Sequence, residues 1–242
     1  MLKERKEGKT EMATFVLIHG SYQGGWIWKK VATRLRAAGH EVYAPTLDGC
    51  GERASQVRAG IDTESQADEM AQLLFYEDLE NVVLGGTSSG GMVVCRVAEL
   101  IPDRIGRLVF VDALALLDGE KIRDIVTRST AQTGTGGLTA GPSREDAANR
   151  LFADLDPAQR EHALERYTQH PIGIYDKGVT LDKFWSMPWE ASVIWCKRAP
   201  NPGEAHQRRT AEKLQASFME LDTGHYPMLS MPAELTALLL KG

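Results

Sequence analysis

Short apolar runs alternate with helical patterns along the first half of the chain, and no other feature constrains the fold as strongly. The apolar runs, which predict buried strands, fall at residues 14–18, 41–44, 81–84 and 107–111. Apolar side chains recur at helical spacing in the segments between them, residues 26–38, 63–74 and 90–100. Strands that alternate with helices favour βαβ units, and nearly continuous apolar strands are typical of a sheet covered on both faces. We therefore expect an α/β fold with a mostly parallel, doubly wound sheet.

The segment from residue 116 to residue 189 interrupts this alternation. It shows no convincing strand, but a Gly- and Thr-rich stretch at residues 133–141 and helical patterns at residues 144–152 and 157–167. Strand and helix patterns then resume at residues 192–196, 205–214, 218–221 and 232–240. We predict that residues 116–189 form a helical cap or lid. The remaining predicted parts are a flexible extension at residues 1–12 and a core made of residues 13–115 and 190–242.

The composition argues against several classes of protein. The net charge is −5 and Lys and Arg are scattered, so no basic surface for nucleic acid is expected. No apolar run approaches the roughly 20 residues of a membrane-spanning helix. Residues 1–11 are charged, unlike the apolar stretch of a signal peptide. We therefore expect a cytoplasmic protein with a small-molecule substrate and neither a membrane nor a nucleic-acid partner.

Three cysteines, Cys50, Cys95 and Cys196, lack the close spacing of a zinc or redox motif. We interpret them as reduced thiols, with Cys95 and Cys196 in the core. No cluster of His or carboxylate side chains has the spacing of metal ligands. We expect no metal or other cofactor.

The sequence GTSSG at residues 86–90 matches the motif G-x-S-x-G. It falls between a predicted strand and a predicted helix, where this motif forms a sharp turn that presents the serine hydroxyl at the carboxyl edge of a sheet. Gly86 and Gly90 remove the Cβ atoms for which such a turn has no room. We interpret Ser88 as a nucleophile, and the turn as its elbow.

A serine hydroxyl is a weak nucleophile and needs an adjacent base. His225 follows the last predicted strand, from which a loop can reach over the nucleophile, so we predict that it is the base. His19 ends the first strand and is expected to shape the loop that follows. The other histidines are expected to face solvent; they are His40, His162, His170 and His206.

Acyl transfer also needs hydrogen-bond donors for the oxyanion that develops on the carbonyl oxygen. One expected donor is the backbone N–H of Ser89, directly after the nucleophile. The other comes from the loop HGSYQGG at residues 19–25, in which Ser21 is best placed.

Several segments together resemble a known family. They are VLIHGSYQGGW at residues 16–26, GHEVYAP at 39–45, GCGER at 49–53, the elbow, LVFVDA at 108–113 and TGH at 223–225. In this order they resemble the α/β-hydrolase superfamily, and within it a bacterial esterase-type branch related to plant hydroxynitrile lyases and methyl-ester esterases. The resemblance implies the α/β-hydrolase fold. Two residues depart from the pattern: Thr87 stands where such enzymes usually carry His, and Ser89 replaces a bulkier residue, which would widen the acyl pocket.

The acid of the triad is left open by the sequence. Many relatives place it after the strand that here is residues 192–196, yet residues 197–201 contain no carboxylate. Asp112, at the end of the strand 107–111, is the first candidate, and Glu204 is the next. Asp222 is expected to point away, and a Ser–His dyad without an acid also stays open.

Our leading hypothesis is a serine hydrolase that cleaves a carboxylic ester, lactone or thioester of a small apolar or aromatic molecule through an acyl-enzyme. The alternative is a lyase, cyclase or decarboxylase in which Ser88 and His225 act as an acid/base pair. A binding module with a degenerate site is disfavoured, because both residues are intact. The oligomeric state stays open, a homodimer included. The predicted pocket walls include Gly20, Tyr22, Trp26, Phe184 and Trp185.

Overall fold

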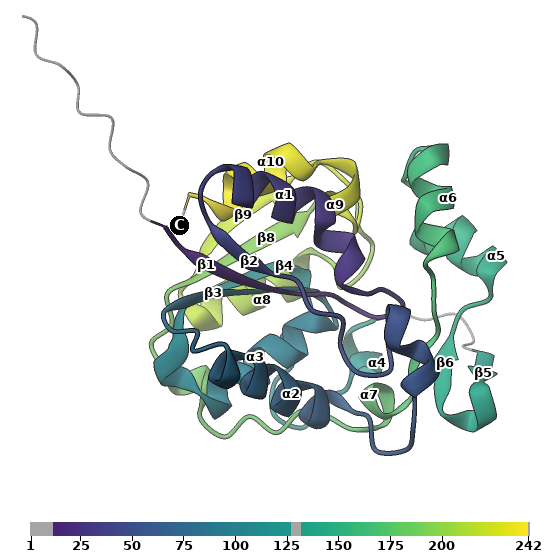
Figure 1. Cartoon of the computed structure of the whole chain (residues 1–242), viewed down its shortest axis with the longest axis horizontal. Coiled ribbons are helices and arrows are strands. Elements are labelled where there is room, and N and C mark those ends of the chain that lie inside the picture. Colours follow the sequence, from purple (N-terminus) through teal and green to yellow (C-terminus); the bar gives the residue numbers. More distant parts are fainter. Residues whose placement is uncertain (1–11, 127–131, 242) are drawn as a thin grey trace, which may run out of the picture.

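Six parallel strands form the main sheet, in the order β2-β1-β3-β4-β8-β9 (Figure 1). The computed structural model describes residues 12–126 and 132–241, so the prediction for residues 1–11 lies outside the described residues. The strands are β1 Thr14–Ile18, β2 Glu41–Tyr43, β3 Val82–Ser88, β4 Ile105–Ala113, β8 Ala191–Cys196 and β9 Ser217–Leu221. The order reverses at β1, which lies between β2 and β3, and such a reversal opens a crevice at the carboxyl ends of the strands. The predicted parallel α/β fold is confirmed.

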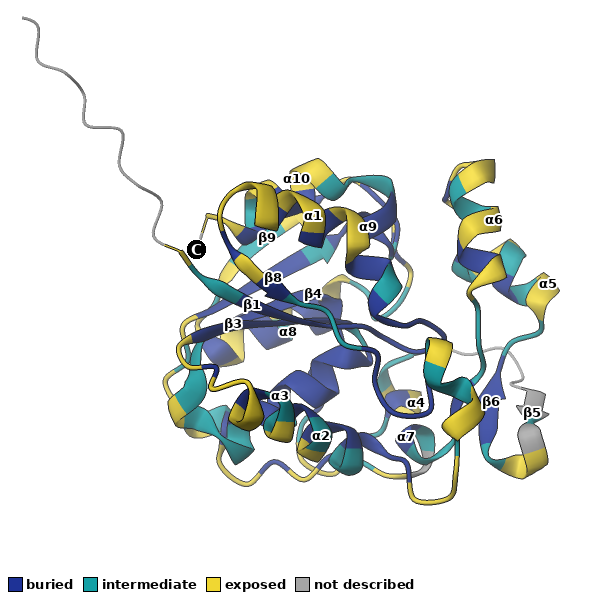
Figure 2. Ribbon diagram, in the orientation of Figure 1, coloured by how far each residue is buried: buried dark blue, intermediate teal, exposed yellow. Residues whose placement is uncertain are grey.

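Side chains on the strands alternate between two buried clusters, one on each face of the sheet. In β1, Val16 and Ile18 belong to one cluster, and Phe15 and Leu17 belong to the other. Figure 2 shows the strands as a dark, buried layer between helices whose outer faces are exposed. Because both faces are covered, the strands are apolar at nearly every position, which is why they could be recognised in the sequence.

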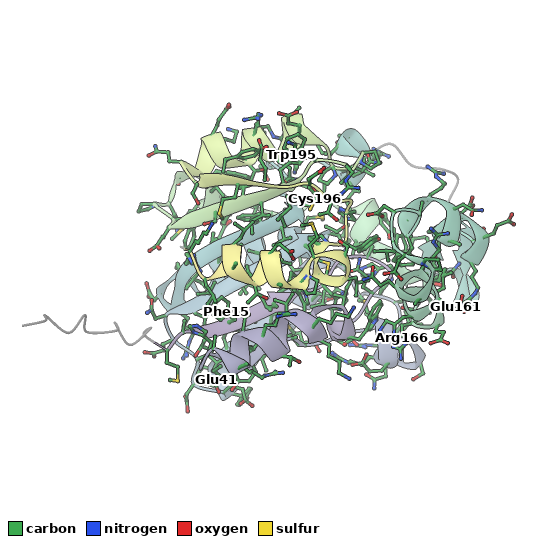
Figure 3. All side chains as sticks on the ribbon, turned by 90° about the horizontal axis from the view of Figure 1, so that it is seen from above. Phe15, Glu41, Glu161, Arg166, Trp195 and Cys196 are labelled. Atoms are coloured by element: carbon green, nitrogen blue, oxygen red, sulfur yellow. The ribbon has the colours of Figure 1, made fainter. Side chains whose placement is uncertain are left out.

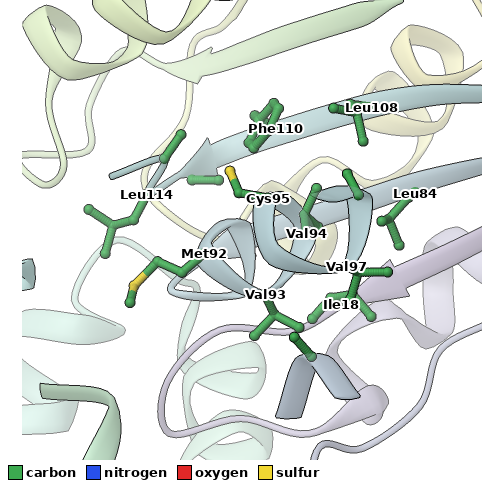
Figure 4. Packing of buried hydrophobic residues seen from close by; sticks show 14 of the residues in the cluster. Ile18, Leu84, Met92, Val93, Val94, Cys95, Val97, Leu108, Phe110 and Leu114 are labelled. Atoms are coloured by element: carbon green, nitrogen blue, oxygen red, sulfur yellow. The ribbon is translucent and has the colours of Figure 1, made fainter. Parts of the chain in front are cut away.

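Three longer helices cover one face of the sheet: α2 Thr63–Tyr76, α3 Gly90–Leu100 and α8 Glu204–Leu214. Figure 4 shows α3 packed directly under the strands, with Val94 and Cys95 among side chains that include Leu108 and Phe110. The helix α2 begins with a side-chain cap. Asp62 is the capping residue, and it accepts a hydrogen bond from the Ser65 backbone N–H at 3.0 Å.

The opposite face is covered by α1 Lys29–Ala37, α9 Pro227–Ser230 and α10 Pro232–Leu239. A 3-10 turn, Gly25–Trp28, precedes α1, so the predicted helix at residues 26–38 is divided in two. Other 3-10 turns are Gly51–Gln56, Pro102–Arg104, Thr135–Gly137 and Phe184–Ser186.

Part of the segment 116–189 lies beyond the carboxyl ends of the strands (Figure 1). In Figure 3, Glu161 and Arg166 of this segment lie at the opposite end of the molecule from Glu41. Its helical elements are α4 Ile122–Ile125, α5 Arg144–Asp146, the π-helical turn Ala147–Leu151, α6 Pro157–Glu165 and α7 Gly173–Asp176. The prediction that it holds no strand is wrong. A small antiparallel sheet of three strands joins β5 Gln132–Gly134, β6 Thr139–Gly141 and β7 His170–Pro171.

The histidines differ from the prediction that four of them face solvent. His162 is exposed, but the other three are buried, at 7% exposure or less; they are His40, His170 and His206. Each buried ring has polar contacts, for example the hydrogen bond that His206 Nε2 accepts from the Ala115 N–H at 3.0 Å. The three cysteines are free and buried. No helix in the described ranges combines the length and hydropathy needed to cross a bilayer.

Candidate active site

The motif at residues 86–90 forms a strained turn between β3 and α3. Ser88, the last residue of β3, has a φ of 52°, in the left-handed region that is unfavourable for a residue with a side chain. A Cβ atom on Gly90 would lie 2.4 Å from the His19 carbonyl oxygen, so only glycine allows β1 and α3 to approach so closely. The tight packing around Gly90 holds the turn in this conformation.

The loop after β1 passes directly beside Ser88. A Cβ atom on Gly20 would lie 2.5 Å from Ser88 Cβ and 3.1 Å from Ser88 Oγ. The Gly20 N–H donates to Gln23 Oε1 at 3.3 Å, which ties the start of the loop to its middle. Gly20 therefore packs against the proposed nucleophile rather than forming a wall of the cavity described below.

His19 fixes the shape of this loop. Its Nδ1–H donates to the Gly20 carbonyl at 2.8 Å, and its Nε2 accepts from the Leu47 N–H at 3.0 Å. The ring is fully buried, and this burial lowers the pKa of His19 to about 4. A neutral ring with one donor and one acceptor satisfies both hydrogen bonds, so the role of His19 is to hold the conformation of this loop.

His225 and Asp112 form a hydrogen-bonded pair above the ends of β4 and β8. His225 Nδ1 donates to Asp112 Oδ2 at 2.5 Å, and Asp112 Oδ1 accepts from the Cys196 N–H at 3.3 Å. Asp112 is completely buried, and burial raises the pKa of its carboxyl, while the contact with His225 acts in the opposite direction. Because Nδ1 is occupied, Nε2 is the nitrogen of His225 that is left to accept a proton.

Asp112 has a φ of 46°, so two residues at neighbouring strand ends, Ser88 and Asp112, hold left-handed conformations. Strain of this kind persists only where the surrounding structure imposes it, and it is concentrated at functional sites. Here the Leu114 N–H donates to the Ser88 carbonyl at 2.8 Å, which joins the two strand ends directly.

Ser88 and His225 line the same cavity, which has a volume of about 190 Å³. No hydrogen bond joins the two side chains in the described ranges, and such contacts often tighten only when substrate is bound. Ser21 and Ser89, the predicted oxyanion-binding residues, line the cavity as well. Their hydroxyls form a hydrogen bond of 2.8 Å between the β1 loop and the elbow.

The other predicted pocket residues lie in different places. Tyr22 lines the cavity, but Trp26 and Trp185 are not part of its wall as far as the structure describes the chain. The Trp26 ring packs edge-on against His162 at 5.7 Å, and Trp185 packs against Phe184 at 5.1 Å. Both tryptophans therefore pack against neighbouring aromatic rings.

The two other carboxylates considered as the acid, Glu204 and Asp222, form ion pairs with arginine side chains. Glu204 begins α8 and pairs with Arg208 at 2.7 Å, and Asp222 is exposed and pairs with Arg198 at 3.2 Å. Of the carboxylates considered from the sequence, the structure brings Asp112 to His225.

Sequence reasoning missed several residues of the cavity wall. Tyr226 directly follows His225, and the rest come from the segment 116–189 and from the loop after β8. They are Val126, Pro142, Asp146, Arg150, Leu151, Pro200, Asn201 and Pro202. Nothing in their local sequence distinguishes them, apart from the position of Tyr226 next to the histidine. Within the described ranges, no group of three or more His, Cys, Asp or Glu side chains could hold a metal ion.

Residues 15–238 match the model of the alpha/beta hydrolase family, which is most of the chain. The chain therefore belongs to the α/β-hydrolase family. It is 37% identical to Methylesterase 3 of Arabidopsis thaliana over 249 residues, which cover 93% of this chain and 94% of that protein.

Two further similarities agree with this assignment. The chain is 36% identical to the carbendazim hydrolyzing esterase of Nocardioides sp. (strain SG-4G) over 118 residues, a match that spans 49% of each protein. Among solved structures, an extracellular alpha/beta-hydrolase from a Paenibacillus species superposes with a TM-score of 0.82 at 25% identity, covering 95% of this chain and 98% of that one.

Proposed function

We propose that this chain is a cofactor-independent serine esterase that acts on esters of small, largely apolar molecules. One observation carries the proposal: Ser88, on its strained turn, and His225, bonded to the buried Asp112 at 2.5 Å, line one cavity. Methylesterase 3 and the carbendazim hydrolyzing esterase carry the names of ester-cleaving enzymes, which supports an ester as the bond that is broken.

In the first step, Ser88 Oγ attacks the carbonyl carbon of the ester while His225 Nε2 accepts the hydroxyl proton. Asp112 accepts from Nδ1–H of the ring, so Nε2 is the nitrogen of His225 that can take the proton from Ser88. The carboxylate then stabilises the imidazolium that forms, without taking its proton. The electrons of the carbonyl double bond move to the oxygen, which becomes an oxyanion.

The backbone N–H groups of Ser21 and Ser89 are the proposed donors to this oxyanion. Donors that are fixed in advance cost no reorganisation during the reaction, and removing one typically lowers kcat by about 10²–10³-fold. The Ser21–Ser89 hydroxyl bond supports this role, because it ties together the two segments that carry the donors.

Collapse of the tetrahedral intermediate breaks the bond to the alcohol, which leaves with the proton from His225 Nε2. The product is an acyl-enzyme on Ser88. Water then attacks the acyl carbon, again losing a proton to His225, and the carboxylic acid departs as Ser88 regains its proton. The overall reaction consumes one water molecule and yields one acid and one alcohol.

The cavity favours a small substrate. Its volume of about 190 Å³ is below the range of roughly 300–1,000 Å³ that holds drug-sized ligands. Tyr22, Tyr226, Leu151 and Val126 supply apolar surface to its wall. These dimensions support esters of short or compact acids with small alcohols.

The proposal is tested with p-nitrophenyl acetate, butyrate and octanoate, methyl esters of aromatic acids, and a γ-lactone. We expect hydrolysis of the short and compact esters, and a loss of about 10⁴-fold or more in kcat for Ser88→Ala, because the nucleophile is gone. A fluorophosphonate should label the wild type once, at Ser88. If Ser88→Ala kept its activity, the proposal would be wrong. If no ester or lactone of the panel were hydrolysed although the fluorophosphonate labelled Ser88, the result would instead indicate the non-hydrolytic alternative.

A further inference from the structure

The hydroxyl groups of Ser21 and Ser89 meet inside the cavity. We propose that this hydroxyl pair donates a third hydrogen bond to the oxyanion, in addition to the two backbone N–H groups. The inference rests on the proposed esterase function and concerns the side chains rather than the backbone of these residues. The two oxygens are 2.8 Å apart, and both residues are buried, with exposures of 6% and 7%.

The number of protons in the pair leads to this proposal. Two hydroxyls carry two protons, and the hydrogen bond between them uses one. Neither hydroxyl has another hydrogen bond to any residue in the part of the chain that the structure describes. The hydroxyl that accepts in the pair therefore retains a proton without an acceptor, beside a cavity that both residues line. An oxyanion formed in that cavity is an acceptor for it.

The position of the pair agrees with this role. Ser89 follows the proposed nucleophile directly, and Ser21 follows Gly20, whose backbone lies against the Ser88 side chain. The side chains therefore branch from the same two residues whose N–H groups are proposed to face the oxyanion. A hydroxyl that already accepts one hydrogen bond is polarised and becomes a stronger donor.

Two other hydroxyl pairs in the chain show how this one differs. Thr223 Oγ1 and Ser230 Oγ lie 2.7 Å apart, and Ser230 also donates to the Tyr226 carbonyl at 3.1 Å, so both protons have acceptors. Ser217 donates to Ser192 at 2.9 Å, near the amino ends of β8 and β9, where no residue of the cavity lies. Of these three pairs, only Ser21–Ser89 has a hydroxyl proton without an acceptor among the described residues and also lines the cavity.

The test compares Ser21→Ala, Ser89→Ala and the double variant on the best p-nitrophenyl ester. In either single variant the remaining hydroxyl no longer has a partner and can turn its own proton toward the oxyanion, so we expect kcat to fall only about 3–10-fold. The double variant has no such proton, and its kcat should fall about 100-fold, with KM changed by less than about twofold. A trifluoromethyl ketone, which forms an oxyanion adduct with an active serine, should bind the double variant more weakly by the same factor.

Other results would overturn the inference. If each single variant lost as much kcat as the double variant, the hydroxyls would only tie the two segments together. A loss confined to KM would indicate contact with the substrate before reaction, and unchanged kinetics would exclude any role. Ser192→Ala with Ser217→Ala is the matched control, because it removes an equivalent pair away from the cavity and should leave kcat unchanged.

The design separates this inference from the proposed esterase function. Fluorophosphonate labelling of Ser88 to completion in the double variant shows that its nucleophile is still active. If the wild type showed no Ser88-dependent hydrolysis, the esterase proposal would fail and this inference with it. If the wild type hydrolysed esters while the single and double variants lost equal activity, only this inference would fail.

Discussion

The two sides of the cavity are built in different ways. On one side, Ser88 and the groups near it follow strands of the main sheet, and β3 is paired to β4 at seven register positions. On the other side, the wall comes partly from the segment 116–189, whose strands are two or three residues long. The difference indicates that the sheet fixes the proposed reacting groups, whereas short elements shape the space proposed for the substrate.

This division has a physical reason. Bond-breaking groups must keep their geometry within a few tenths of an ångström, and residues at the ends of packed, hydrogen-bonded strands can do so. The wall contacts the substrate through apolar surface, which tolerates small shifts. We therefore expect changes on the sheet side to act on kcat and on stability, and changes on the other side to act on KM.

Among changes on the sheet side of the cavity, Asp112→Asn should have the largest effect on kcat. Asn has the same shape, but it cannot stabilise the imidazolium and it favours the wrong tautomer of His225. We expect kcat to fall about 10³–10⁴-fold, with KM changed little, as measured with the best p-nitrophenyl ester.

Glu204→Gln is the matched control for this change, because Glu204 is an exposed carboxylate at the start of α8 whose partner is Arg208. Its kcat should equal that of the wild type. A strong effect of Glu204→Gln together with a weak effect of Asp112→Asn would contradict this prediction. It would mean that Glu204, at the start of α8, and not Asp112, near the end of β4, is the acid.

The sheet could be predicted from the sequence because its strands are apolar at nearly every position. The bounds of β1 and α3 agree with the predictions to the residue. The predictions for β3 and β4 are too short, since Gly and Asp are poor strand formers; pairing to neighbours on both sides extends these strands to Ser88 and Ala113.

The site and the segment 116–189 were harder to predict. The ends of β4 and β8 are adjacent, so the sequence could not show which of them would bring a carboxylate to His225. The hairpin of β5 and β6 falls in a Gly- and Thr-rich stretch without the alternation of a strand. The chemistry of Trp26 and Trp185 suits a pocket wall, and only their packing in the described part of the chain places them away from the cavity. The division into core and cap stays a prediction.

A smaller effect is expected from pH, through the buried His19 on the sheet side. Its pKa is about 4 in the folded protein against 6.5 in the unfolded chain, so the unfolded state binds more protons between these values. The contribution of His19 to the free energy of unfolding is therefore complete above pH 6.5 and is lost as the pH falls toward 4. Between pH 8 and pH 5, His19 should reduce the free energy of unfolding by roughly 2 kcal/mol.

Urea unfolding of the wild type and His19→Gln at these two pH values measures this contribution. The variant should lose about 2 kcal/mol less than the wild type on acidification, whatever its stability at pH 8. His162→Gln is the control from the segment 116–189, because His162 is exposed and its removal should change the pH dependence far less. If the free energy of unfolding fell equally in the wild type and in His19→Gln between pH 8 and pH 5, the prediction would be wrong, because the His19 ring would then be protonated in the folded protein at pH 5.

The smallest effect should come from Leu151→Ala on the other side of the cavity. Leu151 is half-buried at the end of the π-helical turn Ala147–Leu151, and it lines the cavity. Losing about half the burial energy of a leucine, roughly 1 kcal/mol, should raise KM for short esters about fivefold and leave kcat unchanged. The added space should favour longer acyl chains. Leu238→Ala, a half-buried leucine of α10 outside the cavity wall, should leave KM unchanged. A fall in kcat for Leu151→Ala would mean that this segment also positions the reacting groups.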